Sequence, residues 1–473
     1  MFVIKKQDLA VLKFNFNQYL LIMKKNLLQF CLFMFSTFAF SQAGHIMQGV
    51  GAFNMSMGGA STGQPLDISG ALQWNPASIS AFNDKIIKLD AGLFFSSPEL
   101  SSSLPAGMMG TGSPAVSGVT KDARDPSIMP ALAMVWGKEN SKHTFGVSVF
   151  GISGFGVTFP EEVNQPLSAS FNPTLNSNPI NYPQQAGGFG RIKSDYMLLQ
   201  IGLTWAYEIT DKLSVGVEPT FNYGTLQLMP NPTASPSAAG YPYTNKASTT
   251  GFGAQFGLYF DSKKGFKAGV SYKTTQNLSE LEFKNTYLDN SAGTNKFDMD
   301  YPAILSFGLG YSKYDFDLAL DYRMVDYKNT NGFSDTGWTP TASVKGFGWD
   351  NVSILSAGVQ YKGIKKLPLR LGYTYSSNPI SSDVTFFNIP ATAIIKNAFQ
   401  LGFSYDATNN FSLDAVYHHG FSDGKTSGQM LNPMLASSSN PYGAIPGTTV
   451  AYEMITDLVM VGISYKFDKK SVK

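Results

Sequence analysis

Cysteine and charged residues are both scarce in this chain of 473 residues. The single cysteine, Cys31, cannot form an intrachain disulfide. Charged residues make up 14% of the chain, whereas a typical soluble domain contains about 25%. The 35 basic and 33 acidic residues are nearly balanced, and a nucleic-acid surface would need clustered Lys and Arg. We therefore expect no nucleic-acid partner.

Long apolar runs are also absent beyond the N-terminal region, where no stretch approaches the roughly 20 residues that a transmembrane helix needs. Aromatic residues nevertheless form 14% of the chain, with 36 Phe and 23 Tyr, and the mean hydropathy is −0.07. Apolar residues are thus plentiful but dispersed, as expected when alternate residues face lipid and a polar lumen. A soluble β-sandwich would alternate in the same way, so composition leaves both classes open.

The N-terminus has the features of a secretory signal peptide. Residues 23–25 are Met-Lys-Lys, residues 27–40 are apolar but too few to cross a bilayer, and residues 39–41 resemble a cleavage site. We predict that residues 1–41 are removed and that the mature chain starts near Gln42. Because a complete signal begins at residue 23, a start at the first methionine and a start at the second both stay open.

From about residue 85 onwards, apolar and polar residues alternate with a period of two. In residues 399–406, Phe, Leu, Phe and Tyr alternate with Gln, Gly, Ser and Asp, and residues 459–467 repeat the rule. Such alternation is the signature of β-strands. Aromatic residues recur at the segment ends, where membrane barrels place their interfacial girdles.

The connections between these segments alternate between short turns and long loops. The long ones are rich in Pro, Gly, Ser and Asn and cover roughly 96–128, 154–190, 230–247, 286–297, 329–350, 377–396 and 420–452. An up-and-down barrel with short periplasmic turns and long external loops produces this rhythm. We predict an all-β, antiparallel transmembrane barrel of about fourteen strands over residues 85–467, followed by a tail at 468–473.

Residues 42–84 do not follow the strand pattern. They contain many small, turn-forming residues and few alternating apolar ones. A barrel of about fourteen strands has a lumen wide enough to leak unless something fills it. We therefore predict that residues 42–84 form a plug, or hatch, inside the lumen rather than a periplasmic extension.

Three parts of the chain resemble a known family. The first runs from Gly49-x-Gly51 through Met57-Gly58-Gly59-Ala60 and Asp67 to Trp74-Asn75-Pro76-Ala77. The second is Trp349-Asp350-Asn351. The third is Leu369-Arg370-Leu371-Gly372-Tyr373, followed by Asn378-Pro379-Ile380, Pro390 and Leu401-Gly402-x-x-Tyr405. In this order they are similar to the FadL/TodX family of outer-membrane transporters for long-chain fatty acids and aromatic hydrocarbons.

The resemblance implies a barrel with a hatch, loops that capture substrate, a pocket touched by the hatch N-terminus, and lateral exit through a kink in the third strand. That strand would be Thr144 to Gly156, and its kink would lie at Gly151, Gly154 and Gly156, because glycine in a strand marks bends. The hatch would be anchored by the turn Trp74, Asn75, Pro76 and Ala77. The ligand-contacting N-terminus would comprise Gln42, Ala43, Gly44, His45, Ile46 and Met47.

No catalytic constellation stands out, and we expect no enzymatic activity, no metal site and no cofactor. The charged residues expected to face the lumen are Glu208, Glu218, Asp317, Asp321, Arg323, Arg370, Asp406 and Asp414. Their default role is a mutually paired, hydrated lining. A cation could instead hold the carboxylate of a ligand, and the candidates are Arg191, Lys193 and Arg370.

The sequence therefore predicts a passive channel for long-chain fatty acids or similar hydrophobic molecules. It would lie in the outer membrane of a Gram-negative bacterium, among lipid and lipopolysaccharide, and we favour a monomer. A small-solute porin and a structural or adhesive barrel acting through its loops are the alternatives. Large apolar residues of the loops either capture substrate or pack on one another: Met108, Met109, Phe155, Phe159, Phe171 and Tyr182.

Overall fold

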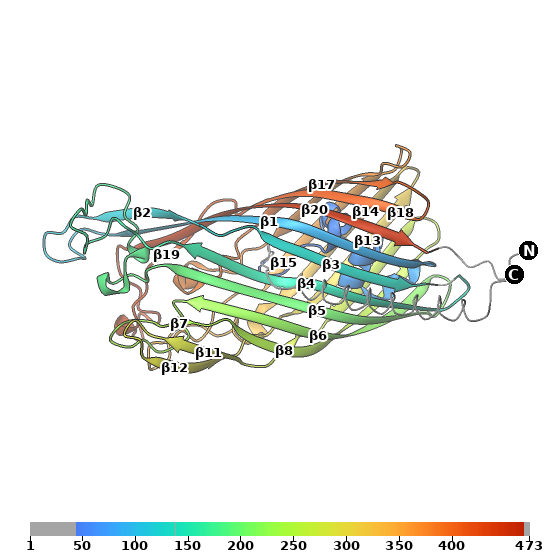
Figure 1. The fold of residues 1–473 in the computed structure, drawn as a ribbon. Helices are drawn as coiled ribbons and strands as arrows, with labels where there is room; N and C mark the ends of the chain where they lie inside the picture. Colours follow the sequence, from blue (N-terminus) through green and yellow to red (C-terminus); the bar gives the residue numbers. More distant parts are fainter. Residues whose placement is uncertain (1–43, 138, 468–473) are drawn as a thin grey trace, which may run out of the picture. The chain divides into compact units, whose positions relative to one another are not determined.

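The computed structural model describes residues 44–137 and 139–467, which form a closed antiparallel barrel (Figure 1). The predicted signal segment 1–41 and tail 468–473 lie outside the described residues. The barrel strands are β1 (Lys85–Leu104), β3 (Ser127–Trp136), β4 (His143–Phe159), β5 (Ile192–Glu208), β6 (Leu213–Met229), β8 (Ala247–Asp261), β9 (Phe266–Lys273), β13 (Ala303–Lys313), β14 (Phe316–Asp326), β15 (Val352–Tyr361), β16 (Leu369–Ser376), β17 (Asn397–Asp406), β18 (Phe411–Phe421) and β20 (Thr449–Lys466). Each pairs with the next in this series, and β20 pairs with β1. The predicted up-and-down barrel of fourteen strands is confirmed.

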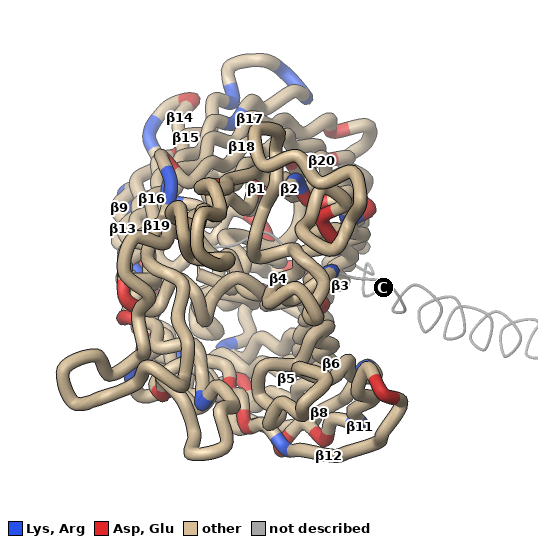
Figure 2. The backbone as a smooth tube through the Cα atoms, turned by 90° about the vertical axis from the view of Figure 1, so that its left-hand side faces the viewer, with Lys and Arg blue, Asp and Glu red and all other residues tan. Residues whose placement is uncertain are grey.

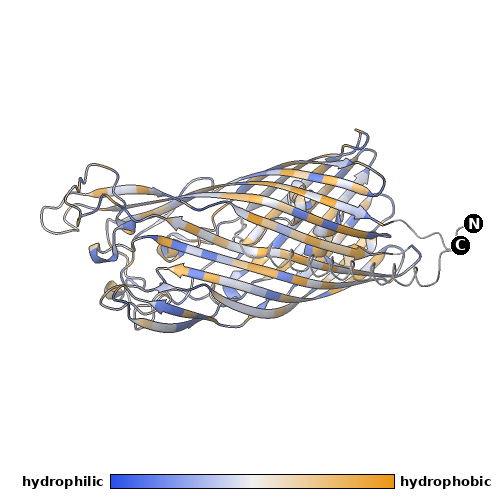
Figure 3. Cartoon of the chain, viewed as in Figure 1, coloured by the Kyte–Doolittle hydropathy of each residue, from blue (hydrophilic) through white to orange (hydrophobic). Residues whose placement is uncertain are grey.

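Strand β14 shows why these residues form the wall of a membrane barrel. Its Leu318, Leu320 and Tyr322 are exposed on one face, whereas Asp321 and Arg323 on the other face are buried. Hydrophobic and hydrophilic residues alternate in the same way along the other strands (Figure 3). Because each described barrel strand pairs with two neighbours, the wall lacks the open edge strands that would have to hydrogen-bond in lipid.

Short turns join the strands at one end of the barrel and long loops join them at the other (Figure 1). The loops contain the remaining elements: β2 (Val116–Lys121), β7 (Tyr243–Thr244), β10 (Asn277–Leu278), β11 (Leu281–Thr286), β12 (Ala292–Phe297), β19 (Thr426–Gly428), η2 (Pro179–Asn181), η3 (Gln184–Ala186), η4 (Tyr327–Asn329), η5 (Ser382–Asn388) and η6 (Pro433–Leu435). Seen from the loop end, the loops lie over the barrel mouth and carry scattered charges of both signs (Figure 2).

Strand β1 extends further than its sequence indicates. Residues 96–104 lie in a segment predicted to be a loop, yet they continue β1 and pair with β2 and β20. Their serines and proline give no apolar alternation, so pairing with the neighbouring strands produces the extension. Strand β20 likewise begins at Thr449, inside the predicted loop 420–452.

Residues 44–84 lie inside the barrel, where nearly all of them are buried (Figure 1). They form α2 (Gly51–Ser56), α3 (Ile68–Trp74) and the 3-10 helix η1 (Pro76–Ala81). Helix α2 contacts β16, β17, β18 and β20, and η1 contacts β5, β6 and β8. The predicted hatch within the lumen is confirmed. Among the described residues, we find no helix with the length and apolar character needed to cross a membrane.

Polar side chains start two of the hatch helices. Asp67 caps α3 by accepting hydrogen bonds from the N–H groups of Ser69 and Gly70. Asn75 caps η1 by accepting from the N–H of Ala77 at 3.1 Å, and proline occupies the first helical position, where a missing N–H costs little. These local caps stabilise short helices in a segment that has no regular apolar periodicity.

Candidate functional site

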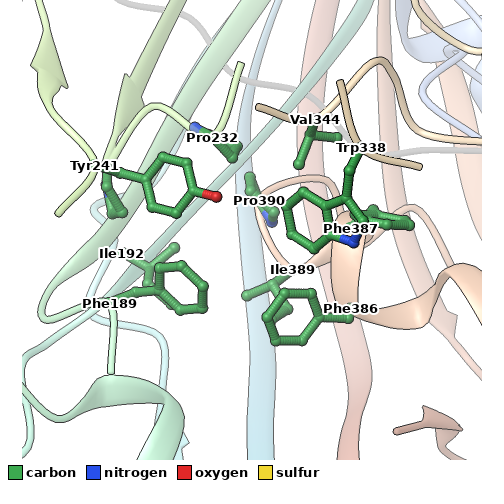
Figure 4. Close-up of a pocket in the computed structure, with 11 residues that line it drawn as sticks. Phe189, Ile192, Pro232, Tyr241, Trp338, Val344, Phe386, Phe387, Ile389 and Pro390 are labelled. Atoms are coloured by element: carbon green, nitrogen blue, oxygen red, sulfur yellow. The ribbon is translucent and has the colours of Figure 1, made fainter. Parts of the chain in front are cut away.

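The loops at the barrel mouth enclose an apolar pocket (Figure 4). It contains about 450 Å³ of empty space, part of which is open to solvent. Four interstrand connections and the first residue of β5 supply its lining, which consists of Phe189, Ile192, Pro230, Pro232, Tyr241, Trp338, Val344, Phe386, Phe387, Ile389 and Pro390. None of these residues is charged, so the pocket favours a hydrophobic molecule over water.

The polar atoms of the pocket side chains are already occupied. The indole Nε1 of Trp338 donates to the carbonyl of Tyr442 at 2.9 Å, and the hydroxyl of Tyr241 donates to the carbonyl of Ala342 at 2.6 Å. The Trp338 ring also packs edge to face on Phe387, with 5.0 Å between the ring centroids. The side chains therefore hold the loops together and present an apolar surface to the pocket.

A second cluster lies at the start of the hatch, where aromatic rings surround His45. The ring centroids lie 4.6–6.5 Å from that of the imidazole, and the rings belong to Phe155, Tyr196, Tyr301, Tyr327, Phe333 and Trp349. Tyr327 holds the imidazole, because its Oη lies 2.5 Å from His45 Nδ1 and accepts from the His45 backbone N–H at 3.2 Å. Burial lowers the pKa of His45 to about 3, so the ring is neutral at physiological pH.

Backbone hydrogen bonds join the hatch N-terminus to β4, the third strand of the barrel. The N–H of Met47 donates to the carbonyl of Ile152, and the N–H of Gly154 donates to the carbonyl of His45, both at 3.1 Å. At this place the register between β4 and β5 shifts within residues 151–153, because Ile152 is an extra residue. Such a bulge bends its strand.

Strands β3 and β4 separate beyond the bulge. Their pairing stops at Ala131 and Phe150, although β4 stays paired with β5 up to Phe159. Pro130, the next residue of β3, has no N–H to donate to the ladder. Residues 151–155 are buried on both faces, unlike the alternating wall strands, which indicates that β4 bends inward here. We call residues 151–157 the inner stretch of β4; here β4 pairs with β5 but not with β3.

The segment before β3 bridges the outer end of the inner stretch of β4. The carboxylate of Asp122 accepts from the N–H of Thr158. Arg124 lies against Gly156, where a Cβ would collide with the guanidinium group, and its Nη2 donates to Asp195 at 2.9 Å. The inner stretch of β4 is therefore bounded by the bulge at one end and by this polar bridge at the other.

Buried charges fasten the hatch to the wall. Asp321 of β14 accepts from the N–H groups of residues 61–62, both at 2.9 Å. Arg323 pairs with Asp321 at 2.6 Å and donates to the carbonyl of Gly59 at 2.6 Å. Its guanidinium also lies 3.7 Å from the centroid of a ring of Trp74, a favourable cation–π contact.

A second charged network joins the other side of the hatch to the wall. Lys88 of β1 bridges Asp67 of the hatch at 3.0 Å and Asp414 of β18 at 2.8 Å. Arg370 of β16 lies 3.5 Å from Asp414 and donates to the hydroxyl of Ser56 at 2.6 Å. These charged side chains are at most 8% exposed, and breaking such buried pairs is strongly destabilising. The sequence analysis missed Lys88.

The predicted anchor turn 74–77 rests directly on the barrel wall. The Asn75 amide donates to the carbonyl of Leu258 in β8 at 2.9 Å. Gly216 of β6 and Gly257 of β8 pair with each other, and a Cβ on either would collide with the turn. These two glycines permit the close approach of hatch and wall.

The predicted ligand-contacting segment is buried where it meets the bulge, as far as the structure describes it: Gly44, His45, Ile46 and Met47. Gln42 and Ala43 lie outside the described residues. Gly44 has a φ of +62°, and a Cβ there would lie 2.6 Å from the Tyr327 hydroxyl. Glycine therefore allows the chain to turn towards the aromatic cluster.

None of the three candidate carboxylate partners lines the apolar pocket. Arg191 is exposed ahead of β5. Lys193 lies on the opposite face of β5 from the pocket residue Ile192, because successive strand residues alternate between faces. Arg370 is engaged by Asp414. The role of these cations in binding a carboxylate stays a prediction.

Most residues of the apolar pocket and of the aromatic cluster around His45 were not predicted from the sequence. None of the six apolar residues singled out in the loops lines the apolar pocket, although Phe155 belongs to the cluster around His45. Trp349 stands in a motif that carries the family resemblance, but no local pattern places it beside the hatch. His45 and Tyr327 are 282 residues apart in the chain, so only the folded barrel brings them together.

Comparison with known proteins identifies the family of the chain. The family model described as outer membrane protein transport protein (OMPP1/FadL/TodX) matches residues 178–467, which is more than half of the sequence. The chain belongs to this family. The resemblance drawn from the sequence is confirmed, and this FadL/TodX member is an outer-membrane channel for hydrophobic compounds in a Gram-negative bacterium, not an enzyme.

Solved FadL/TodX structures share the fold. A FadL homologue from Pseudomonas aeruginosa aligns with a TM-score of 0.67 at 14% identity, over 90% of this chain and 100% of its own. The toluene transporter TodX of Pseudomonas putida gives 0.62 at 16% identity, with coverage of 89% and 99%. The toluene transporter TbuX of Ralstonia pickettii gives 0.58 at 16% identity, again with 89% and 99%. No curated protein sequence matches the chain significantly.

Proposed function

We propose that this protein is a passive channel through which long-chain fatty acids or similar hydrophobic molecules enter the cell. The substrate would be captured in the apolar loop pocket and held beside His45 at the hatch N-terminus. It would then leave sideways into the membrane between β3 and β4. The observation that carries the proposal is the continuity of apolar and aromatic residues from the pocket to the inner stretch of β4, with which β3 does not pair.

Strand β5 connects the pocket with the cluster around His45. Ile192 lines the pocket, and the ring of Tyr196 stacks on the imidazole of His45 at 5.8 Å. Both residues lie on the buried face of β5, with Ser194 between them donating to the carbonyl of the pocket residue Pro390. At the usual rise of a strand, Ile192 and Tyr196 are about 13 Å apart. A molecule that moves along this face stays among buried side chains throughout.

The cluster around His45 adjoins the place where release is proposed. Phe155 lies in the inner stretch of β4 and its ring centroid is 4.9 Å from that of Tyr196. The His45 carbonyl accepts from Gly154 of the same stretch. A substrate beside His45 would therefore touch β4 where β3 does not pair with it. Lateral release there spares a hydrophobic molecule the passage through a polar lumen that the hatch fills.

Replacing Phe387 by glutamate should lower the initial rate of uptake of a radiolabelled fatty acid or hydrocarbon by about tenfold or more, because a charge buried in an apolar pocket must keep its water or lose its ionisation. Phe387 is 3% exposed and points into the pocket (Figure 4). Uptake can be measured with cells that carry this protein as their sole transporter of the class, or with proteoliposomes.

The control for this test is Met434→Glu, since Met434 is 87% exposed and lies outside the pocket. It should leave uptake unchanged, and Phe387→Leu should retain most of it. Unchanged uptake by Phe387→Glu would speak against capture in the pocket. High ion conductance of the unmodified protein in a planar bilayer would favour the small-solute porin instead.

A further inference from the structure

The aromatic cluster at the hatch contains three buried polar atoms that no described residue satisfies: Nε2 of His45 and the hydroxyls of Tyr196 and Tyr301. Nε2 of His45 and Oη of Tyr301 have no hydrogen-bond partner within the described part of the chain, and both residues are 0% exposed. Their rings are neighbours, with centroids 5.9 Å apart. Buried polar groups are nearly always hydrogen-bonded, because desolvation without a partner is unfavourable. The two atoms therefore indicate a place for a polar atom of a ligand.

Tyr327 engages Nδ1 of the imidazole, so this nitrogen is satisfied. The Tyr196 hydroxyl faces Ser153, but the Ser153 hydroxyl donates to the carbonyl of His45 at 2.9 Å, and Oη of Tyr196 has no hydrogen-bond partner among the described residues. The remaining rings around the imidazole are Phe155, Phe333 and Trp349. The hydrogen-bonding capacity left for a ligand thus lies at Nε2 of His45 and at the hydroxyls of Tyr196 and Tyr301.

The surroundings do not suit a negatively charged group. Two charged residues lie close enough to influence the phenols of the cluster, Asp300 and Arg323. Arg323 is already paired with Asp321, and Asp300 is an acid that would repel a carboxylate. The pKa of His45, lowered by burial to about 3, keeps the imidazole uncharged. A carboxylate would lose its hydration here without gaining a cation.

We propose that His45 and Tyr301 bind the hydroxyl group of an uncharged amphiphile, an alcohol or a phenol with a hydrophobic tail. A hydroxyl can donate to one of the two atoms and accept from the other, whichever imidazole nitrogen carries the proton. A hydrocarbon would leave both atoms unsatisfied. The tail would extend along β5 towards the apolar pocket. This inference rests on the proposed function and narrows it: among the hydrophobic molecules proposed there, an uncharged amphiphile is favoured beside His45 over an ionised fatty acid.

Three probes of equal chain length test the inference: 1-decanol, decane and decanoate. Their binding to the purified protein in detergent is measured by equilibrium dialysis against protein-free micelles. The unmodified protein should bind 1-decanol more tightly than decanoate at neutral pH. The variant Tyr301→Phe keeps the ring and removes the hydroxyl, so it should weaken 1-decanol binding about fivefold and leave decane binding unchanged.

A matched control is Tyr259→Phe. Tyr259 lies in β8, outside the cluster, and also has a buried hydroxyl without a partner among the described residues. Its substitution should change the binding of none of the probes. A crystal structure with bound 1-decanol should place the ligand oxygen within hydrogen-bond distance of His45 Nε2 and Tyr301 Oη.

Four outcomes would count against the proposal. Equal weakening of 1-decanol and decane by Tyr301→Phe, or weakening of neither, would overturn the hydroxyl site. Tighter binding of decanoate than of 1-decanol would overturn the inference and leave the proposed channel for hydrophobic molecules intact. Failure of the unmodified protein to bind any of the three probes would overturn both.

Discussion

Substituting Asp321 by alanine should turn the plugged barrel into an ion-conducting pore. The change removes the acceptor for the N–H groups of residues 61–62 and leaves Arg323 buried without its carboxylate. Breaking a buried ion pair costs about 3–5 kcal/mol, which shifts the equilibrium between a seated and a displaced hatch by about a hundredfold or more. Single-channel recording in planar bilayers should show openings that the unmodified protein lacks.

The control for this prediction is Asp350→Ala. Asp350 pairs with Lys328 at 2.7 Å, but the two side chains are 55% and 61% exposed. Such surface pairs contribute only about 0–1 kcal/mol, so the conductance should not change. If Asp321→Ala stays closed and keeps its thermal stability, the hatch does not depend on the buried pair. The ion pairs of Lys88 or the backbone contacts would then hold the hatch inside the barrel.

Deleting Ile152 should abolish uptake of hydrophobic molecules while the barrel still assembles. The deletion removes the extra residue that shifts the register of β4 within residues 151–153. A straight β4 would stay in the wall and could continue its pairing with β3 beyond Phe150, where it now stops. Lateral exit would then be closed. The readout is the initial rate of uptake of a radiolabelled hydrophobic solute into proteoliposomes.

Ile152→Ala provides the comparison, because it keeps the bulge and removes only part of a side chain. It should retain uptake. A folded deletion variant that transports as fast as the unmodified protein would refute lateral release at β4. Assembly of each variant is checked by its resistance to unfolding in cold detergent, so that loss of transport is not confused with loss of the barrel.

The two deviations in strand length show where local pattern stops being informative. Residues 96–104 read as loop because serines and a proline interrupt the alternation, yet β2 and β20 pair with them on either side. A strand that projects beyond the membrane has no lipid on its outer face, and so no reason to carry alternating apolar residues. In the wall itself, where lipid imposes the alternation, the strands were predicted correctly.

The hatch was predicted from the lack of a pattern, and its attachments were only partly foreseen. Asp321, Arg323 and Asp414 were recognised as lumen-facing because they alternate with apolar neighbours. Lys88 was not, although it joins the hatch residue Asp67 to the wall. The sequence shows that a charged side chain points inward, but the residue with which it pairs depends on how the hatch packs inside the barrel.

The sequence by itself determined the wall of this protein: a closed barrel of fourteen strands with a separate segment inside it. It could do so because the two-residue period is a local property that lipid enforces along each membrane-spanning strand. Only the tertiary structure decided the route of the substrate. His45, Tyr196, Tyr301 and Trp349 come from distant parts of the chain and form one cluster. Their contacts depend on barrel closure and on the seating of the hatch, and such long-range packing leaves no periodic trace in the sequence.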